Sequence, residues 1–77
     1  MVYFNYHAKI KRLLSENKFL RCEIVESYND ISPAMLIYFD GEKNPYPVRT
    51  HMWKEYVHLI GLDRIENIED YFHYLMD

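Results

Sequence analysis

The sequence predicts an α+β fold: a small antiparallel sheet of two or three strands packed against helices, in the order α-β-β-(β)-α-α. Apolar residues recur at helical spacing near both ends of the chain, and a continuous apolar run at Ala34–Phe39 has the length of one strand. Hydrophobic residues make up 49% of the chain, with only two Gly and three Pro, which is typical of a folded globular protein.

The chain length limits the number of domains. With 77 residues and no repeat or linker, the chain is expected to form one small globular domain over residues 1–77. A domain of this size has little buried volume, so its core must be dense. Thirteen aromatic residues, among them eight Tyr, meet that need.

The first element is expected to be a helix over residues 5–16. One helical face would be formed by apolar residues at i, i+4, i+7 and i+8, namely Tyr6, Ile10, Leu13 and Leu14. Asn5 is a suitable N-cap. Asn17 suits the left-handed position that ends a helix.

Two or three strands should follow. Residues 19–28 are rich in β-formers, and Leu20, Cys22 and Ile24 would share one face. The second strand, Ala34–Phe39, is almost entirely apolar and so should be covered on both faces. A tight turn is expected at Asp40-Gly41. A short third strand over residues 46–48 would have to lie at a sheet edge, because Pro47 donates no ladder hydrogen bond.

Two helices should complete the chain. Thr50 is the expected cap of the first, Gly61 its end, and its buried stripe is Trp53, Tyr56, Val57 and Ile60. The second helix has a capping-box signal at Asp63 and Glu66, with Asn67 as the alternative cap. Its buried stripe would be Ile65, Ile68, Phe72 and Leu75. All helices should pack on one sheet face and bury the regions of Leu14, Ile37, Trp53 and Phe72 together.

No residue pattern indicates catalysis, and we expect neither an enzyme nor a bound cofactor. The lone Cys22 excludes an internal disulfide and a four-thiolate zinc site, and its place in a strand suits a small hydrophobe. His51, Glu55 and His58 fall at i, i+4 and i+7, a spacing that would let them converge on a metal. That stripe lies opposite Trp53, so we expect a solvated polar face and no metal site.

Aromatic content and the region after the third strand indicate a protein-binding surface. Tyr and Trp are enriched at protein interfaces, and an edge strand followed by cationic and aromatic residues is a place for a partner to dock. The candidate contact residues are Tyr46, Arg49, His51 and Trp53. The favoured function is a non-catalytic protein-binding module, of the kind that serves as a small regulator or accessory subunit. The partner is expected to be another protein, and self-association is left open.

The alternative function is nucleic-acid binding by the basic first helix, through Lys9, Lys11 and Arg12. The order helix, three strands, helix resembles that of double-stranded-RNA-binding domains. Such domains carry a lysine cluster at the start of the second helix, where this chain has Thr50-His51-Met52-Trp53-Lys54. The net charge of −3 also disfavours phosphate binding, so nucleic acid is not the expected partner.

Charge is distributed unevenly along the sequence. Residues 1–21 have five cations and one anion, whereas residues 62–77 have five anions and one cation. We expect two helices that present solvated faces of opposite sign and lie near each other.

The expected location is the cytoplasm, away from membranes. Lysine and arginine interrupt any apolar stretch among the first twenty residues, so no signal peptide is expected. No run approaches the roughly 20 apolar residues that a membrane helix needs. A single cysteine is also consistent with a reducing compartment.

Overall fold

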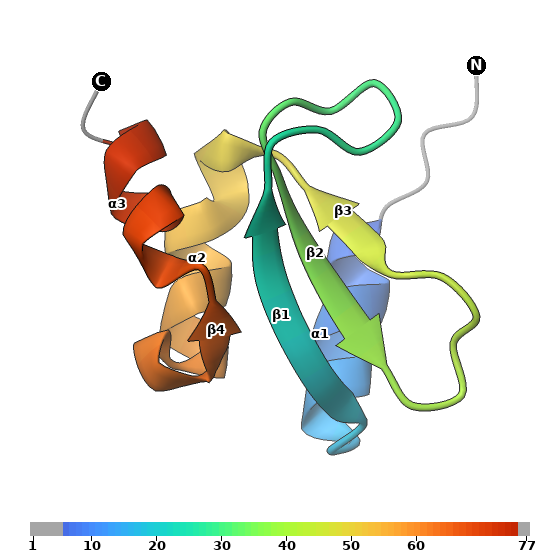
Figure 1. The fold of residues 1–77 in the computed structure, drawn as a ribbon. Coiled ribbons are helices and arrows are strands. Elements are labelled where there is room, and N and C mark those ends of the chain that lie inside the picture. The colour runs from blue at the N-terminus through green and yellow to red at the C-terminus, as the bar shows by residue number, and fades with distance from the viewer. Residues whose placement is uncertain (1–5, 76–77) are drawn as a thin grey trace.

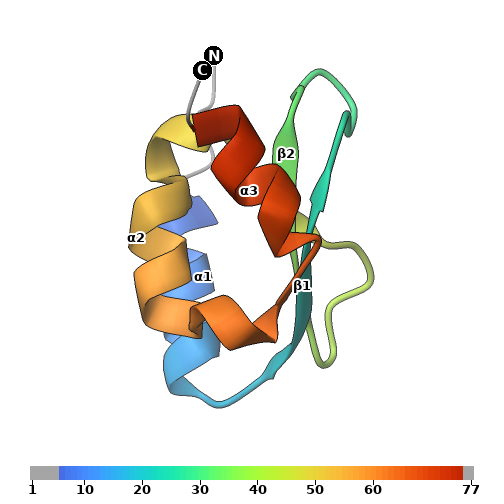
Figure 2. The ribbon, with the colours of Figure 1, turned by 60° about the vertical axis from the view of Figure 1, so that its left-hand side comes forward.

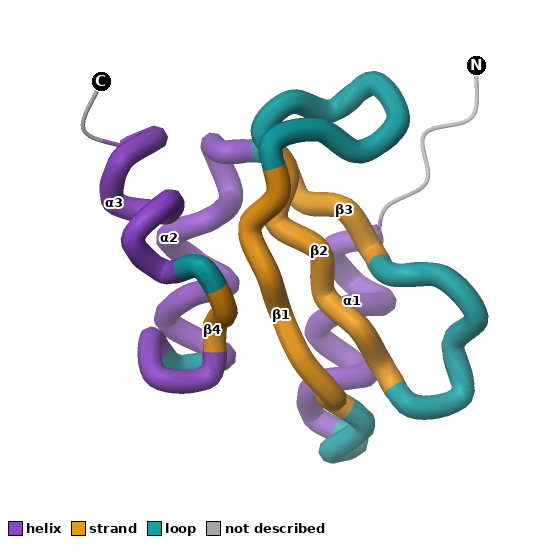
Figure 3. The backbone as a smooth tube through the Cα atoms, viewed as in Figure 1, coloured by secondary structure: helices purple, strands orange, loops and turns teal. Residues whose placement is uncertain are grey.

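The computed structural model describes residues 6–75 and, at Leu75, the backbone alone. Its elements are, in chain order, α1 (Tyr6–Ser15), β1 (Phe19–Val25), β2 (Ala34–Phe39), β3 (Tyr46–Val48), α2 (Thr50–Ile60), the 3-10 helix η1 (Leu62–Arg64), β4 (Ile65–Glu66) and α3 (Ile68–Leu75) (Figures 1 and 3). The predicted α+β class is confirmed. The sheet, however, has a fourth strand that the sequence did not indicate.

The fourth strand makes the sheet mixed rather than antiparallel. Its strand order is β3-β2-β1-β4. The β1–β2 and β2–β3 pairs are antiparallel, whereas β4 runs parallel to β1 and pairs Cys22 with Ile65 and Glu23 with Glu66. The prediction of a capping box is therefore wrong, because Asp63 lies in η1 and Glu66 in a strand.

The helices lie on one side of the sheet, as expected (Figure 2). The buried core between the two layers includes residues from all three α-helices and all four strands. Trp53 lies at its centre with 0% exposure, and the rings of Tyr71 and Tyr74 in α3 each lie 6.0 Å from it. On the opposite sheet face Ala34 and Leu36 are buried but Tyr38 is half-buried, so β2 is only partly covered there.

The helix α1 begins and ends close to the predicted positions. Ile10 and Leu13 are buried, and Leu14 packs against the core. Asn17 has a φ of 61°, the left-handed conformation expected of it, and Lys18 donates its amide to the carbonyl of Leu13. The predicted cap Asn5 lies outside the described residues.

A bulge near the start of β1 changes the predicted facing of one residue. Phe19 pairs with Phe39 and Arg21 with Tyr38, so Leu20 is one residue more than its partner strand provides. Cys22 and Ile24 face the core as predicted, but Leu20 is 61% exposed. β1 also ends at Val25, earlier than predicted, because Tyr28 forms a bridge with Ile31 in the following turn.

The start of α2 differs from the prediction, whereas its buried stripe does not. Thr50 is the first helical residue, and the N-cap is Arg49, which has an extended backbone and makes no side-chain capping hydrogen bond. The stripe Trp53, Tyr56, Val57 and Ile60 is buried throughout. Gly61 ends the helix with a φ of 105°, and its amide donates to the carbonyl of Val57 over 2.8 Å.

The last helix presents a different face to the core from the one predicted. Asn67 has a φ of 62° and interrupts the chain before Ile68, so Ile65 belongs to a strand and does not extend the helical stripe. Tyr71 is therefore buried at 7% exposure, and Phe72 is 48% exposed. The prediction that Phe72 joins the core is wrong.

Candidate functional site

A cleft opens between the start of α1, strand β3 and the first turn of α2. Its volume is about 330 Å³. Its walls and floor are formed by Tyr6, His7, Ile10, Pro47, Val48, Arg49, His51, Met52 and Tyr56. A second hollow of about 370 Å³ adjoins it along the β2–β3 loop and shares Tyr6 and Pro47 with it. We call the first the α1–β3–α2 cleft and the second the loop hollow.

The floor of the α1–β3–α2 cleft is fixed by a polar chain that joins α1 to α2. The Tyr56 hydroxyl and Nδ1 of His7 are hydrogen-bonded, and Nε2 of His7 lies 3.7 Å from Oε1 of Glu55. Lys11 Nζ lies 2.9 Å from the same carboxylate oxygen and holds the pKa of Glu55 below its usual value. Burial raises the pKa of Tyr56 to about 12. The floor therefore presents a neutral tyrosine whose hydroxyl is already paired.

The wall on the β3 side depends on Trp53. Its indole Nε1 donates to the carbonyl of Val48 over 2.8 Å, across the junction where β3 ends and α2 begins. Arg49 and His51 lie between Val48 and Trp53 in the sequence and are exposed at the rim of the cleft. The bond thus sets the direction in which α2 leaves the sheet and positions the two exposed residues.

The four residues predicted to contact a partner separate into two layers. Arg49 and His51 are exposed and line the α1–β3–α2 cleft. Trp53 lies in the core, and so does Tyr46, whose hydroxyl donates to Glu42 and whose ring lies 5.5 Å from that of Tyr6. Tyr46 and Trp53 therefore support the surface from beneath.

The rim is positively charged in a chain whose net charge is −3. Within residues 6–75, no carboxylate lies at ion-pair distance from Arg49 or from Lys43 of the loop hollow. The carboxylate of Glu42, which also lines the loop hollow, is 3.4 Å from Lys9 Nζ. The hydrogen bond from Tyr46, together with Lys9, holds the pKa of Glu42 below its usual value. Glu42 thus stays ionised but compensated, which leaves Arg49 and Lys43 in excess.

The basic residues of α1, in contrast to Arg49 and Lys43, are paired with carboxylates. Lys9 pairs with Glu42 at 3.4 Å, Lys11 with Glu55 at 2.9 Å, and Arg12 with Glu16 at 3.9 Å. Each cation proposed for nucleic-acid binding thus has a carboxylate beside it. Glu16 directly follows α1, Glu55 lies in α2, and Glu42 lies in the β2–β3 loop. None of the three carboxylates that pair with these cations belongs to the acidic segment of residues 62–77.

The possible metal stripe lies partly at the cleft, where His51 lines it and Glu55 contacts His7, whereas the cysteine lies in the core. His51, Glu55 and His58 are all exposed on α2, and the part of the chain that the structure describes holds no group of three or more His, Cys, Asp or Glu able to bind a metal ion. Cys22 is fully buried between β2 and β4, and burial raises the pKa of its thiol to about 12. None of the helices in the described residues is long and apolar enough to span a membrane.

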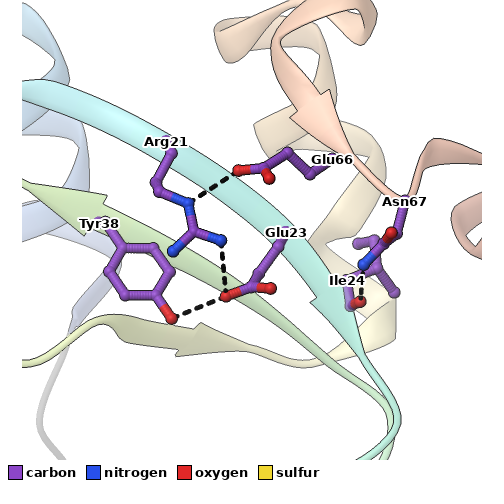
Figure 4. Close-up of polar contacts among 6 residues, drawn as sticks. All are labelled: Arg21, Glu23, Ile24, Tyr38, Glu66 and Asn67. Atoms are coloured by element: carbon purple, nitrogen blue, oxygen red, sulfur yellow. Dashed lines mark hydrogen bonds and ion pairs between the residues drawn. The ribbon is translucent and has the colours of Figure 1, made fainter.

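The helix-free face of the sheet carries a polar network that the sequence did not reveal (Figure 4). Arg21 Nε donates to Oε2 of Glu66 over 2.8 Å, and its Nη2 lies 3.1 Å from Oε2 of Glu23. The Tyr38 hydroxyl donates to the same Glu23 oxygen over 2.8 Å, and the Arg21 guanidinium lies 4.5 Å from the Tyr38 ring centre. One guanidinium is shared by two carboxylates, so the network ties β1 to β2 and β4 and has a formal charge of −1.

Two cleft residues, His7 and Met52, escaped prediction from the sequence. His7 precedes Ile10 by three positions and so lies on the edge of the buried face of α1. A buried Tyr needs a hydrogen-bond partner, and that requirement at Tyr56 is a signal that a polar group must approach it. The identity of that group could not be read from the sequence, because His7 and Tyr56 are 49 residues apart.

No protein-family model, curated protein or solved structure matches this chain. What the α1–β3–α2 cleft can bind is therefore inferred from the residues that line it. It combines an apolar wall and floor, formed by Ile10, Val48 and Met52, with a cation at the rim that has no carboxylate at ion-pair distance among residues 6–75. Such an arrangement can bury an apolar side chain while attracting a negatively charged group.

Proposed function

We propose that this chain is a non-catalytic protein-binding module that uses the α1–β3–α2 cleft, with Arg49 and His51 as exposed contact residues. The observation that carries the proposal is an arginine at the mouth of an apolar cleft, with no ion pair in the part of the chain that the structure describes. Arginine is enriched at protein interfaces because its flat guanidinium both stacks and forms paired hydrogen bonds. A module of this size would serve as a small regulator or accessory subunit.

The lining of the cleft supports a protein partner. Met52 is half-buried and has an unbranched, polarizable side chain that adapts to the shape of what it contacts. Tyr6 is 43% exposed and, with Pro47, joins the cleft to the loop hollow. Two adjoining hollows give a surface longer than a single side chain, which suits a polypeptide segment.

The nucleic-acid alternative has less support from the structure. Affinity for phosphates depends on lysine and arginine charges that are free to replace counterions. Lys9, Lys11 and Arg12 each have a carboxylate within 4 Å. These exposed pairs add little stability but reduce the positive potential of α1.

The test is capture of partners from a lysate of the source organism by the tagged protein, with and without nuclease, analysed by mass spectrometry. The cleft variant carries Arg49→Glu and His51→Glu. A control variant with Lys18→Glu and Lys54→Gln changes the formal charge by the same amount at exposed positions outside the cleft. Tyr46 is left intact, because it is buried and its loss would disturb the fold.

A stoichiometric, nuclease-resistant partner that the cleft variant loses and the control variant keeps would support the proposal. Both variants should keep the thermal midpoint of the unaltered protein to within a few degrees, since exposed substitutions change stability little. A partner retained by the cleft variant would show that the contact surface lies elsewhere. Capture that disappears with nuclease, and with neutralisation of Lys9, Lys11 and Arg12, would favour the nucleic-acid alternative.

A further inference from the structure

The positive charge around the two hollows restricts the chemistry of a partner that could bind there. Arg49 and His51 lie at the cleft, and Lys43 lines the loop hollow, with Tyr6 and Pro47 shared between them. The carboxylate that lines the loop hollow, Glu42, is compensated by Lys9. A ligand that lies along both hollows therefore meets positive charge in each and apolar surface between.

The floor of the cleft favours an apolar group over a polar one. Ile10, Val48 and Tyr56 are almost fully buried beneath it, and half-buried Met52 has further surface to cover. The hydroxyl of Tyr56 and the ring of His7 already satisfy each other. A polar side chain entering here would lose its water without gaining a partner, whereas an apolar one gains by leaving water.

Exposed acidic residues lie on elements that line neither hollow. Asp63, Glu69 and Asp70 are exposed on η1 and α3, and within residues 6–75 none of them has a cation at ion-pair distance. Positive charge at the two hollows and these carboxylates outside them favour the approach of an acidic partner to the hollows.

We propose that the α1–β3–α2 cleft binds an acidic segment of a partner protein that buries one large apolar side chain and flanks it with Asp or Glu. This inference rests on the proposed function and specifies the chemistry of its partner. The apolar side chain contacts Met52 and the cleft floor, and the flanking carboxylates contact Arg49 on one side and Lys43 on the other. Carboxylates suit the arginine fork because they accept two parallel hydrogen bonds.

Peptide selection tests this chemistry directly. A random dodecapeptide display library is selected in parallel against the unaltered protein, the cleft variant Arg49→Glu with His51→Glu, and the control variant Lys18→Glu with Lys54→Gln. Peptides enriched by the unaltered and control proteins, but not by the cleft variant, should carry Asp or Glu around a central Phe, Leu, Ile, Met or Trp. The best of them is then resynthesised with every Asp and Glu replaced by Asn and Gln.

Fluorescence anisotropy of the labelled peptides gives the expected sizes of effect. The amide peptide should bind at least about tenfold more weakly than the acidic one at low salt, and raising the salt should remove most of that difference. Replacing the central apolar residue by Ser should weaken binding by a similar factor, about the worth of one buried large side chain.

Each other outcome overturns the inference. Neutral or basic peptides lost by the cleft variant would keep the cleft as a binding site but show that its partner is not acidic. Equal enrichment by the cleft variant, or no enrichment, would show that the cleft takes no such segment. Sedimentation velocity of the protein alone is the remaining arm, since α3 itself presents Phe72 beside Glu69. Self-association that the cleft variant abolishes would make a second copy the occupant.

Discussion

Replacing Trp53 with Phe removes one buried hydrogen bond at the junction where β3 ends and α2 begins, and its cost can be estimated. The carbonyl of Val48 loses its donor inside the core, a penalty of about 1–3 kcal/mol. Phe is smaller than Trp by about 40 Å³, and at about 24 cal/mol per Å³ the resulting cavity adds about 1 kcal/mol. The expected loss in the free energy of unfolding is therefore about 2–4 kcal/mol. A chain of 77 residues has about 4–12 kcal/mol in total, so this loss is a large fraction of it.

Urea unfolding followed by far-ultraviolet circular dichroism measures this loss. Fluorescence is unsuitable because Trp53 is the only tryptophan. With an m-value of about 1 kcal/mol per M, the unfolding midpoint should fall by about 2–4 M. Tyr71→Phe is the matched control, because it removes a hydroxyl that makes no hydrogen bond within the described residues and keeps the ring that stacks on Trp53. The control should shift stability by less than about 0.5 kcal/mol. A loss below about 1 kcal/mol for Trp53→Phe, with an unchanged m-value, would refute the role given to the indole hydrogen bond.

Two further predictions concern titratable groups in the core. Because Cys22 is fully buried and its thiol pKa is raised to about 12, iodoacetamide at pH 8 should alkylate the folded protein at least about 10³-fold more slowly than the protein in urea. Equal rates would show that β1 is open to solvent. Burial raises the pKa of Tyr56 from 10.0 to about 12, so the stability linked to this difference is intact below pH 10 and is lost as the pH rises through 12. The decline should reach about 2–3 kcal/mol and be smaller in Tyr56→Phe, and an equal decline in both proteins would contradict the assignment.

Elements with a long or unambiguous pattern could be predicted from the sequence. β2 has its predicted bounds because six consecutive apolar residues fit one buried strand. The stripe of α2 is predicted correctly because four apolar residues at helical spacing define one face, and Gly61 supplies the positive φ that ends the helix. Asn17 is a similar case at the end of α1.

Elements determined by distant contacts could not be predicted. β4 has two residues, too few for any periodicity, and exists because Ile65 pairs with Cys22 more than forty positions earlier. The side chain of Asn67 donates to the carbonyl of Ile24 over 3.1 Å. Its positive φ separates Ile65 from α3, so that a different face of α3 is buried and Phe72 is exposed. The bulge at Leu20 likewise depends on the register of β1 against β2, which no single strand encodes.

The candidate site shows the same division. Arg49 and His51 are exposed where the sequence placed a binding surface, because they follow an edge strand and precede the buried stripe of α2. Tyr46 and Trp53 were assigned to the same surface for their aromatic character, but a small domain needs large side chains to fill its core. His7 could not be anticipated, since only the packing of α1 against α2 brings it to Tyr56.

The two short outer strands limit the pairing of this sheet with a strand of another chain. β3 has three residues, one of them Pro47, and β4 has two. β4 covers only part of β1, and the rest of β1 is irregular or occupied. The side chain of Asn67 donates to the carbonyl of Ile24, and the bulge interrupts the ladder between Phe19 and Arg21. Neither edge offers a stretch of regular backbone long enough to template an added strand, which guards the sheet against fibril growth. The partner proposed above should therefore contact side chains in the two hollows and not add a strand to the sheet.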